Sequence, residues 1–237
     1  MGCLENEKGT ADGKGITDGK GIVDGKCIIV GAGEFVPIEI PKDEGDFCIA
    51  ADGGLENCEM VGLFPDMIIG DFDSAGPMTR RTVEEMEKEC PERVKRLPPE
   101  KDDTDILYGI RLGLEKGYRK FYLYGALGGR LDHTIGNIQC LIYLRNRGAK
   151  GYIMEHNQLL TIAQNETITF HKSMKGRLSV FSMTEKSEGV TLSDLKYELK
   201  DAVITNDFPI GISNEFVGKA ASVTVEKGTL LVMVAWE

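Results

Sequence analysis

The sequence lacks several features whose absence excludes broad classes of protein. No apolar run approaches the roughly 20 residues of a membrane span, so no membrane partner is expected. The first residues carry no basic stretch followed by an apolar one, which argues against a secretory signal. Positive charge is scarce, since 28 Lys and Arg residues face 38 Asp and Glu residues and leave a net charge of −10. This balance argues against nucleic acid as the main partner.

Disulfide and zinc patterns are also missing. The six cysteines form no C-x-x-C pair, and several lie inside apolar runs. Such cysteines are typical of buried free thiols in a reducing compartment, so a cytoplasmic protein is expected. His133, His156 and His171 are too scattered to suggest a zinc site, and nothing favours a catalytic Cys–His pair.

The N-terminal segment, residues 1–25, is rich in glycine and lysine. The tripeptide Asp-Gly-Lys occurs three times, beginning at Asp12, Asp18 and Asp24. One interpretation is a phosphate-binding loop, but the spacing fits neither G-x-x-x-x-G-K-[ST] nor G-x-G-x-x-G, and no strand precedes it. Glycine at this density without an apolar face instead predicts a flexible segment.

From Cys27 onward, short apolar runs alternate with amphipathic segments. The apolar runs predict buried strands at 27–30, 47–51, 67–69, 94–97, 121–124 and 151–154. The amphipathic segments predict helices at 54–62, 77–89, 104–116 and 134–147. This alternation predicts an α/β domain over residues 26–156, with a mostly parallel sheet and flanking helices. Ligands of such a sheet bind at the carboxyl ends of its strands.

The helical period disappears after about residue 156. Strands are predicted at 166–170, 178–183, 197–205, 221–225 and 230–236, separated by glycines. This pattern predicts an all-β second domain, residues 157–237, folded as a small antiparallel sandwich or barrel.

Four polar clusters fall at predicted strand ends or helix starts of the α/β domain. Asp71 and Asp73 follow an apolar run with i, i+2 spacing, which in a strand places both side chains on one face. Hard oxygen ligands of this kind suit Mg²⁺. The other clusters begin at Asp52, Lys101 and Gly125. Together they predict a site for phosphoryl chemistry at one edge of the sheet.

Each cluster also has a plain structural interpretation. The Asp-Gly-Gly sequence at Asp52 is often a turn, and paired aspartates are often a cap or a turn. Either Asp103 or Thr104 can cap the helix that follows, and Asp132 can cap the next one.

The functional interpretation assigns other roles to the same clusters. Asp105, in the first turn of its helix, would supply a third metal ligand. Lys101 and Arg130 would neutralise phosphate charge, the latter with its planar fork of donors.

The ordered motifs resemble those of the thiamine pyrophosphokinase family. They are Asp52-Gly-Gly, Pro65-Asp-x-x-x-Gly-Asp-Phe-Asp-Ser74, Lys101-Asp-x-Thr-Asp105, Gly128-Gly-Arg-x-Asp-His133, Gly189…Leu195-Lys-Tyr-x-Leu199 and Gly211-Ile-Ser-Asn-Glu215. The resemblance runs from about residue 27 to the end of the chain, and the N-terminal segment departs from it.

The resemblance implies Mg²⁺-dependent transfer of an intact diphosphate from ATP to the hydroxyethyl group of thiamine, with release of AMP. It implies a homodimer with active sites between subunits. Asp71, Asp73 and Asp105 match the family's Mg²⁺-binding aspartates, and either Asp73 or Asp105 could accept the hydroxyl proton. The implied nucleotide and phosphate contacts are Asp52, Ser74, Lys101, Thr104, Arg130, Asp132 and His133. The implied thiamine contacts are Asn137, Tyr197, Ser213 and Asn214.

Three rival functions remain open at this point. One is another diphosphokinase on the same fold, acting on a hydroxymethylpterin, which the Gly-Ile-Ser-Asn-Glu stretch disfavours. A second is a Mg²⁺-dependent phosphatase that uses the Asp-x-Asp pair. A third is a non-catalytic nucleotide or thiamine sensor, against which the three intact aspartates weigh.

Overall fold

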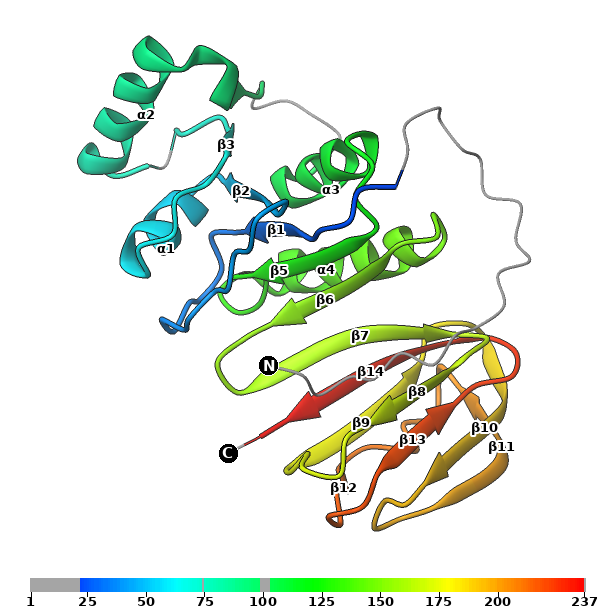
Figure 1. Ribbon diagram of the computed structural model, residues 1–237. Coiled ribbons are helices and arrows are strands. Elements are labelled where there is room, and N and C mark those ends of the chain that lie inside the picture. The colour runs from blue at the N-terminus through cyan, green and yellow to red at the C-terminus, as the bar shows by residue number, and fades with distance from the viewer. Residues whose placement is uncertain (1–21, 74, 99–102, 237) are drawn as a thin grey trace. The chain divides into compact units, whose positions relative to one another are not determined.

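A computed structural model describes residues 22–73, 75–98 and 103–236 of the chain. These residues form two compact units that divide between His156 and Asn157 (Figure 1). The N-terminal repeat up to residue 21, Ser74 and Lys101 lie outside the described residues, so the predictions for them stay predictions.

The first unit is built on parallel strands in the order β6-β5-β1-β2-β3-β4. Every neighbouring pair in this order is parallel. The strands are β1 Cys27–Val30, β2 Phe47–Ala51, β3 Met67–Gly70, β4 Val94–Arg96, β5 Lys120–Tyr124 and β6 Lys150–Met154. The predicted mostly parallel sheet is confirmed, with strand ends that differ from the prediction by at most one residue.

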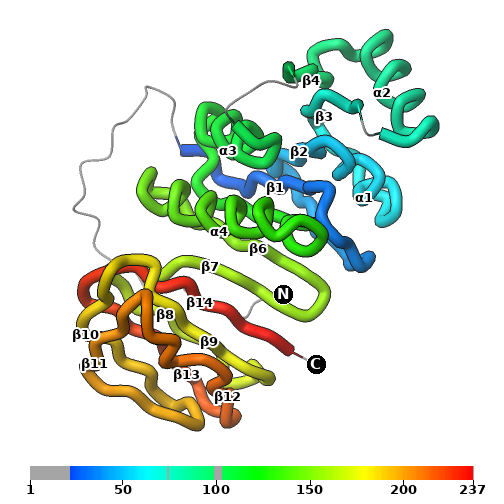
Figure 2. The backbone as a smooth tube through the Cα atoms, turned by 180° about the vertical axis from the view of Figure 1, so that it is seen from behind, coloured from blue at the N-terminus to red at the C-terminus, as the bar shows by residue number. Residues whose placement is uncertain are grey.

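The helices of this unit flank the sheet. They are α1 Gly54–Met60, α2 Pro77–Glu89, α3 Asp105–Glu115 and α4 Leu131–Arg145, with a short 3-10 turn at Pro91–Arg93. Helices α3 and α4 lie side by side against the strands (Figure 2). Gly109 lets α3 approach the sheet closely, because a Cβ at this position would lie 3.3 Å from a side-chain atom of Ile69 and 3.4 Å from one of Ile29.

One of the two predicted helix caps is confirmed and the other is wrong. Thr104 is the N-cap of α3, and its hydroxyl accepts a hydrogen bond from the backbone N–H of Leu107 (3.2 Å). Helix α4 begins at Leu131, three residues earlier than predicted, so Asp132 lies in its first turn and the cap position belongs to Arg130. The turn that the prediction missed, residues 131–133, contains polar residues, so a search for apolar periodicity does not detect it as helical.

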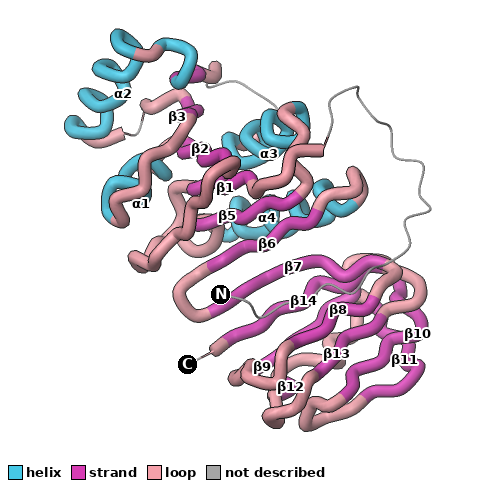
Figure 3. The backbone as a smooth tube through the Cα atoms, in the orientation of Figure 1, coloured by secondary structure: helices cyan, strands magenta, loops and turns pink. Residues whose placement is uncertain are grey.

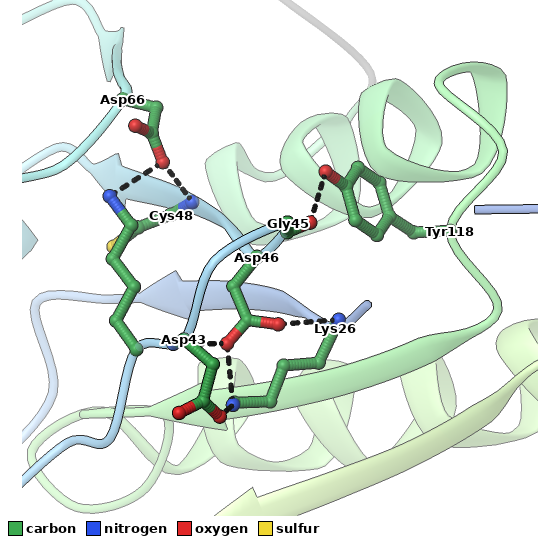
Figure 4. Close-up of polar contacts among 8 residues, drawn as sticks. Lys26, Asp43, Gly45, Asp46, Cys48, Asp66 and Tyr118 are labelled. Carbon is green, nitrogen blue, oxygen red and sulfur yellow. Dashed lines mark hydrogen bonds and ion pairs between the residues drawn. The ribbon is translucent and has the colours of Figure 1, made fainter. Parts of the chain in front are cut away.

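Ion pairs and hydrogen bonds fix the amino ends of the first strands (Figure 4). The Lys26 ammonium lies 2.5 Å from the Asp46 carboxylate and 2.8 Å from that of Asp43. Burial alone would lower the pKa of Lys26, but the hydrogen bonds to both carboxylates outweigh it and raise the pKa. The Asp66 carboxylate accepts the backbone N–H of Cys48 (2.8 Å). These contacts tie down the edge of the sheet opposite the predicted site.

Val23 and Gly25, before position 26, already contact the first unit. The backbone N–H of Val23 donates to the carbonyl of Gly117 (3.1 Å). The backbone at Gly25 approaches Gly45 and Tyr118 so closely that a Cβ would meet them. The folded part of the chain therefore includes the last residues of the predicted N-terminal segment.

The second unit consists of two antiparallel sheets, and its described residues are strands and loops (Figure 3). One sheet has the order β12-β9-β14-β7 and the other β11-β10-β13-β8. The strands are β7 Gln158–Gln164, β8 Thr167–Phe170, β9 Arg177–Ser182, β10 Lys186–Ser193, β11 Leu199–Thr205, β12 Asn214–Glu215, β13 Ala221–Thr224 and β14 Thr229–Ala235. Buried side chains of both sheets share one core, Val180 and Val232 from the first with Leu192 and Val223 from the second. The predicted sandwich is confirmed.

Three strands of the sandwich, β7, β10 and β12, were not predicted. In β10 the pairing with β11 shifts register beside Gly189, which has φ +63°. A bulge of this kind interrupts the alternation of apolar and polar residues on which strand prediction depends. Tyr197, predicted to open a strand, lies two residues before β11.

The described cysteines are free thiols, and all but Cys90 are buried. No helix in the described part of the chain is long and apolar enough to cross a membrane.

Candidate functional site

A cavity of about 550 Å³ lies at the carboxyl ends of the parallel strands. Segments that follow five different strands, β1 to β5, line it, together with the first turns of α3 and α4. The lining residues are Gly31–Gly33, Ala51, Asp52, Asp71, Asp103–Ile106, Gly125, Ala126, Gly128–Arg130, His133 and Asn137. The structure thus brings residues from all four polar clusters together at the predicted edge.

The backbone conformation of Asp52 places this residue in the cavity wall. Asp52 follows β2 and has φ +51°, a left-handed conformation that Asp tolerates better than most residues. Its backbone N–H donates to the carbonyl of Ile69 (2.7 Å), which ties the end of β2 to β3. The turn takes Asp52 out of the sheet and into the cavity wall.

The chain reverses between Asp71 and Asp73. Phe72 between them has φ +61° and is 3% exposed, and the guanidinium of Arg96 lies 5.4 Å from its ring centre. Asp71 lines the cavity, but Asp73 does not. The backbone N–H of Asp73 donates to the Asp71 carboxylate (3.1 Å), and its carbonyl accepts from Arg80 (2.6 Å).

The predicted metal ligands are therefore only partly assembled. Asp71 and Asp105 line the same cavity. No three His, Cys, Asp or Glu side chains of residues 22–73, 75–98 and 103–236 lie close enough together to hold a metal ion. The role of Asp73 as a third ligand stays a prediction.

Two loops, one after β1 and one after β5, form a wall of the cavity by packing backbone against backbone. Gly31 donates to the carbonyl of Tyr124 and Gly33 to that of Gly125, both at 2.8 Å. A Cβ on Gly31 would lie 2.8 Å from the Gly125 oxygen, and one on Gly125 would lie 2.6 Å from the Gly31 oxygen. Neither position has room for a side chain.

Buried polar side chains hold these two loops from behind. Asn57 of α1 donates to the carbonyl of Gly31, and Asn137 of α4 donates to that of Ala126, both at 2.7 Å. Glu155, the residue after β6, accepts the backbone N–H of Ala126 (3.3 Å). Burial raises the pKa of Glu155 to about 7, although hydrogen bonds from the loop backbone act to lower it.

Arg130 and Asp132 form an exposed pair at the mouth of the cavity. Two guanidinium nitrogens of Arg130 contact the two Asp132 oxygens at 3.2 and 2.6 Å. The hydrogen bond from Arg130 holds the pKa of Asp132 below its usual range. Arg130 and His133 line the cavity, whereas Asp132 does not and instead orients Arg130. An anionic ligand would bind the guanidinium N–H donors of Arg130 that are not hydrogen-bonded to Asp132.

The predicted site residues of the second unit cluster around Asn214. Its side-chain oxygen accepts the backbone N–H of Tyr197 and its amide donates to the Tyr197 carbonyl, at 2.9 and 2.6 Å. Asn214 is buried, but the Tyr197 side chain is 60% exposed. Tyr197 is therefore not part of the sandwich core. Ser213 is exposed, has φ +58°, and donates its N–H to the Ser179 hydroxyl (3.0 Å).

Sequence reasoning missed some residues that build the site. Gly31 and Gly33 follow a predicted strand, so a search for glycines after every strand would have found them. Glu155 follows β6 as Asp71 follows β3, and the same strand-end rule would have indicated it. Asn57 carries no comparable signal, because a lone Asn on a short helix is ordinary.

Two family models match the chain. One, described as thiamin pyrophosphokinase, catalytic domain, matches residues 42–153, and the other, described as thiamin pyrophosphokinase, vitamin B1 binding domain, matches residues 165–230.

Proteins similar to this chain match it over most of its length. A thiamine pyrophosphokinase of Bacillus subtilis (strain 168) is 30% identical over 196 residues, which are 81% of this chain and 88% of that protein. A crystal structure of thiamine pyrophosphokinase from Bacillus subtilis superposes with a TM-score of 0.78 at 27% identity, covering 90% of this chain and 99% of that chain. A thiamin pyrophosphokinase structure from Geobacillus thermodenitrificans gives 0.76 at 26% identity, covering 90% and 98%.

We expect the Gly125→Ala variant to be less stable by about 2–4 kcal/mol, because the new methyl group adds a clash to an unfavourable left-handed conformation. The matched control is Gly129→Ala in the same loop. Gly129 also has positive φ, but no atom lies within 4 Å of a Cβ built there, so only the conformational penalty of about 1–2 kcal/mol applies. Urea unfolding of both variants measures the difference, and equal stability would contradict the close packing of the two loops.

Proposed function

The chain belongs to the thiamin pyrophosphokinase family and transfers diphosphate from ATP to thiamine, and we propose that the cavity at the carboxyl edge of its parallel sheet binds the ATP. The observation that supports this location is the convergence of glycine backbone, acidic side chains and the starts of two helices on one cavity. Its volume of about 550 Å³ is that of a small-molecule site. The products of the reaction are thiamine diphosphate and AMP.

We propose that Asp71 and Asp105 hold a Mg²⁺ ion in this cavity, with Asp73 as the third carboxylate. The donor set fits, because Mg²⁺ usually takes one or two carboxylates and completes its coordination with water and phosphate oxygens. When bound, the ion neutralises charge that develops on the phosphate oxygens.

The chain's own residues act mainly by positioning the reactants. Attack of an alcohol on the β-phosphorus, with AMP leaving in line, needs alignment and charge neutralisation more than covalent help. Thr104 and Asp105 at the start of α3 line the cavity, so the backbone donors of a helix N-terminus point toward it. Asp52 and His133 are placed to contact the nucleotide, and Arg130 is placed to contact its phosphates. Lys101, Ser74 and Asp132 keep the nucleotide-site roles that the family motifs imply.

We propose that Asn137 in the first unit, and Tyr197, Ser213 and Asn214 in the second, each have the thiamine-contacting role that the family motifs imply. Asn214 fixes the backbone of Tyr197, whose exposed ring already has the Lys196 ammonium 5.5 Å from its centre and so is placed to contact a cation. A cationic thiazolium over the face of a tyrosine is a favourable pairing. The hydroxyl proton would pass to a carboxylate that is not bound to the metal ion, either Asp73 or Asp105.

We propose that the enzyme is a homodimer and works in the cytoplasm. Helix α4 buries one face, with Cys140, Leu141 and Leu144, against its own unit. Leu131 and Ile135 lie outside this face and are 72% and 51% exposed. A second apolar stripe on one helix is typical of a surface that another chain covers. Free buried thiols suit a reducing compartment.

Incubation with ATP, Mg²⁺ and thiamine tests both the activity and the metal site. Release of AMP together with thiamine diphosphate is expected. Release of orthophosphate would indicate a phosphatase, and the absence of turnover would indicate a sensor. We expect Asp71→Ala, Asp73→Ala and Asp105→Ala each to lower the rate at least ~100-fold, because several kcal/mol of metal stabilisation is lost. Circular dichroism should show an unchanged fold.

Asp207→Ala is the matched control for these variants. Asp207 is exposed in the second unit, and its removal should leave the rate unchanged. Near-normal activity of any one of the three aspartate variants would remove that aspartate from the proposed metal site.

For Tyr197→Ala we expect the KM for thiamine to rise several-fold with little change in the KM for ATP, since a cation–π contact is worth about 0.5–2 kcal/mol. The melting temperature should stay the same because the ring is exposed. Tyr197→Trp should be tolerated. A lower melting temperature with an unchanged KM would place the thiamine contact elsewhere.

Light scattering at micromolar concentration should give twice the 26.0 kDa mass of the chain. Ile135→Asp should shift the protein toward the monomer, because it places a charge in the proposed interface on α4. The matched control is Val203→Asp on β11, where the side chain is similarly exposed. A wild-type species of 26.0 kDa would exclude the dimer.

A further inference from the structure

Glu155 is a buried carboxylate that the family motifs do not include. It follows β6 directly and is 6% exposed. Its oxygen accepts the backbone N–H of Ala126 at 3.3 Å, and its carboxylate is also hydrogen-bonded by the backbone of Leu127. Both partners belong to the loop after β5, residues 125–130.

The backbone at Ala126 is held from two directions. Glu155 takes its N–H, and the Asn137 amide donates to its carbonyl at 2.7 Å. Ala126 itself lines the cavity, as do Gly125 and Arg130 of the same loop, whereas Glu155 does not. Any effect of Glu155 on a ligand must therefore pass through the loop.

The ionised form of Glu155 is the form that suits this position. A carboxylate has two strong acceptors for the two backbone donors, but a neutral carboxyl keeps one good acceptor and adds a hydroxyl donor. Protonation therefore weakens the hold on the loop.

The surroundings bring this change close to neutral pH. Burial raises the pKa of Glu155 to about 7, against the effect of the two backbone hydrogen bonds. Tyr124, a titratable residue at the end of β5, has its pKa raised by burial and stays neutral. His156 and Arg130, next along the chain and in the loop, are exposed.

We propose that Glu155 is a positioning residue, whose ionised carboxylate fixes the backbone of loop 125–130 and so sets the affinity of the cavity for nucleotide. The proposal rests on the assignment of this cavity to ATP. Affinity for ATP should then rise as the pH increases through about 7. Thiamine affinity should not follow.

Stability should change in the opposite direction, which separates positioning from a merely structural role. The pKa of Glu155 is higher in the folded state than in the unfolded one, so the folded state binds more protons between pH 4.5 and about 7. The contribution of this group to the free energy of unfolding therefore falls as the pH rises through that window. A loop held only for stability would not gain affinity while stability is lost.

Steady-state kinetics of Glu155→Gln test the link to nucleotide. Between pH 6 and 8.5 the wild-type KM for MgATP should fall several-fold. The KM of the variant should stay high over this range, apart from the small change that the ionisation of MgATP itself produces. The KM for thiamine should be the same in both proteins. Glu89→Gln, the same substitution at an exposed position of α2, should behave as the wild type.

Amide NMR of the wild-type protein without nucleotide tests the loop directly and requires no variant to fold. The Ala126 and Leu127 amide resonances should titrate with a midpoint near 7, and amide resonances that do not move over this range would overturn the proposal. Titrating amides with an unchanged pH dependence of the KM for MgATP would also overturn it. That second result would show that the loop responds without setting nucleotide affinity, whereas the location of the ATP site is tested separately by the Asp71→Ala and Asp105→Ala variants.

Discussion

The close backbone contact between the loops after β1 and β5 is the constraint on which the site depends. Gly31 and Gly125 approach each other so closely that neither position admits a Cβ. The contact leaves carbonyl groups in an interior where unpaired polar groups are costly. Asn57 and Asn137 from two helices satisfy carbonyls of this wall. A nucleotide-sized cavity with a peptide wall therefore requires polar residues buried behind it, which a purely apolar core could not provide.

The parallel sheet divides its two edges between stability and chemistry. Its inner strands β1, β2 and β3 are buried and apolar, so their polar neighbours concentrate where these strands end, whereas the edge strand β4 is charged and largely exposed. At the amino edge, Lys26 and Asp46 pair with each other and fix the starts of β1 and β2. At the carboxyl edge, Asp52, Asp71 and Asp105 line the cavity. The amino edge thus uses charged side chains to hold strand starts together, and the carboxyl edge places carboxylates in the cavity wall.

The strands and helices of the first unit were predictable because periodicity and local signals agree there. Thr104 begins a helix both by sequence and by its hydrogen bond to Leu107. The prediction failed where backbone geometry overrides pattern, as at the bulge beside Gly189 in β10. Asn57 and Glu155 could not be assigned from type alone, because their importance comes from which backbone groups lie opposite them in the fold.

The pair Asp71 and Asp73 shows how one residue between two others can change the outcome of a spacing rule. The rule that i and i+2 share a face holds for extended chain, and it predicted two carboxylates pointing the same way. Phe72 between them has φ +61° and buries its ring under Arg96, so the chain is not extended at that point. The aromatic side chain gains burial that offsets the unfavourable backbone conformation. The result is an acidic pair split between the cavity and the approach to α2, with Asp71 placed toward the α3 start and Asp73 held by Arg80.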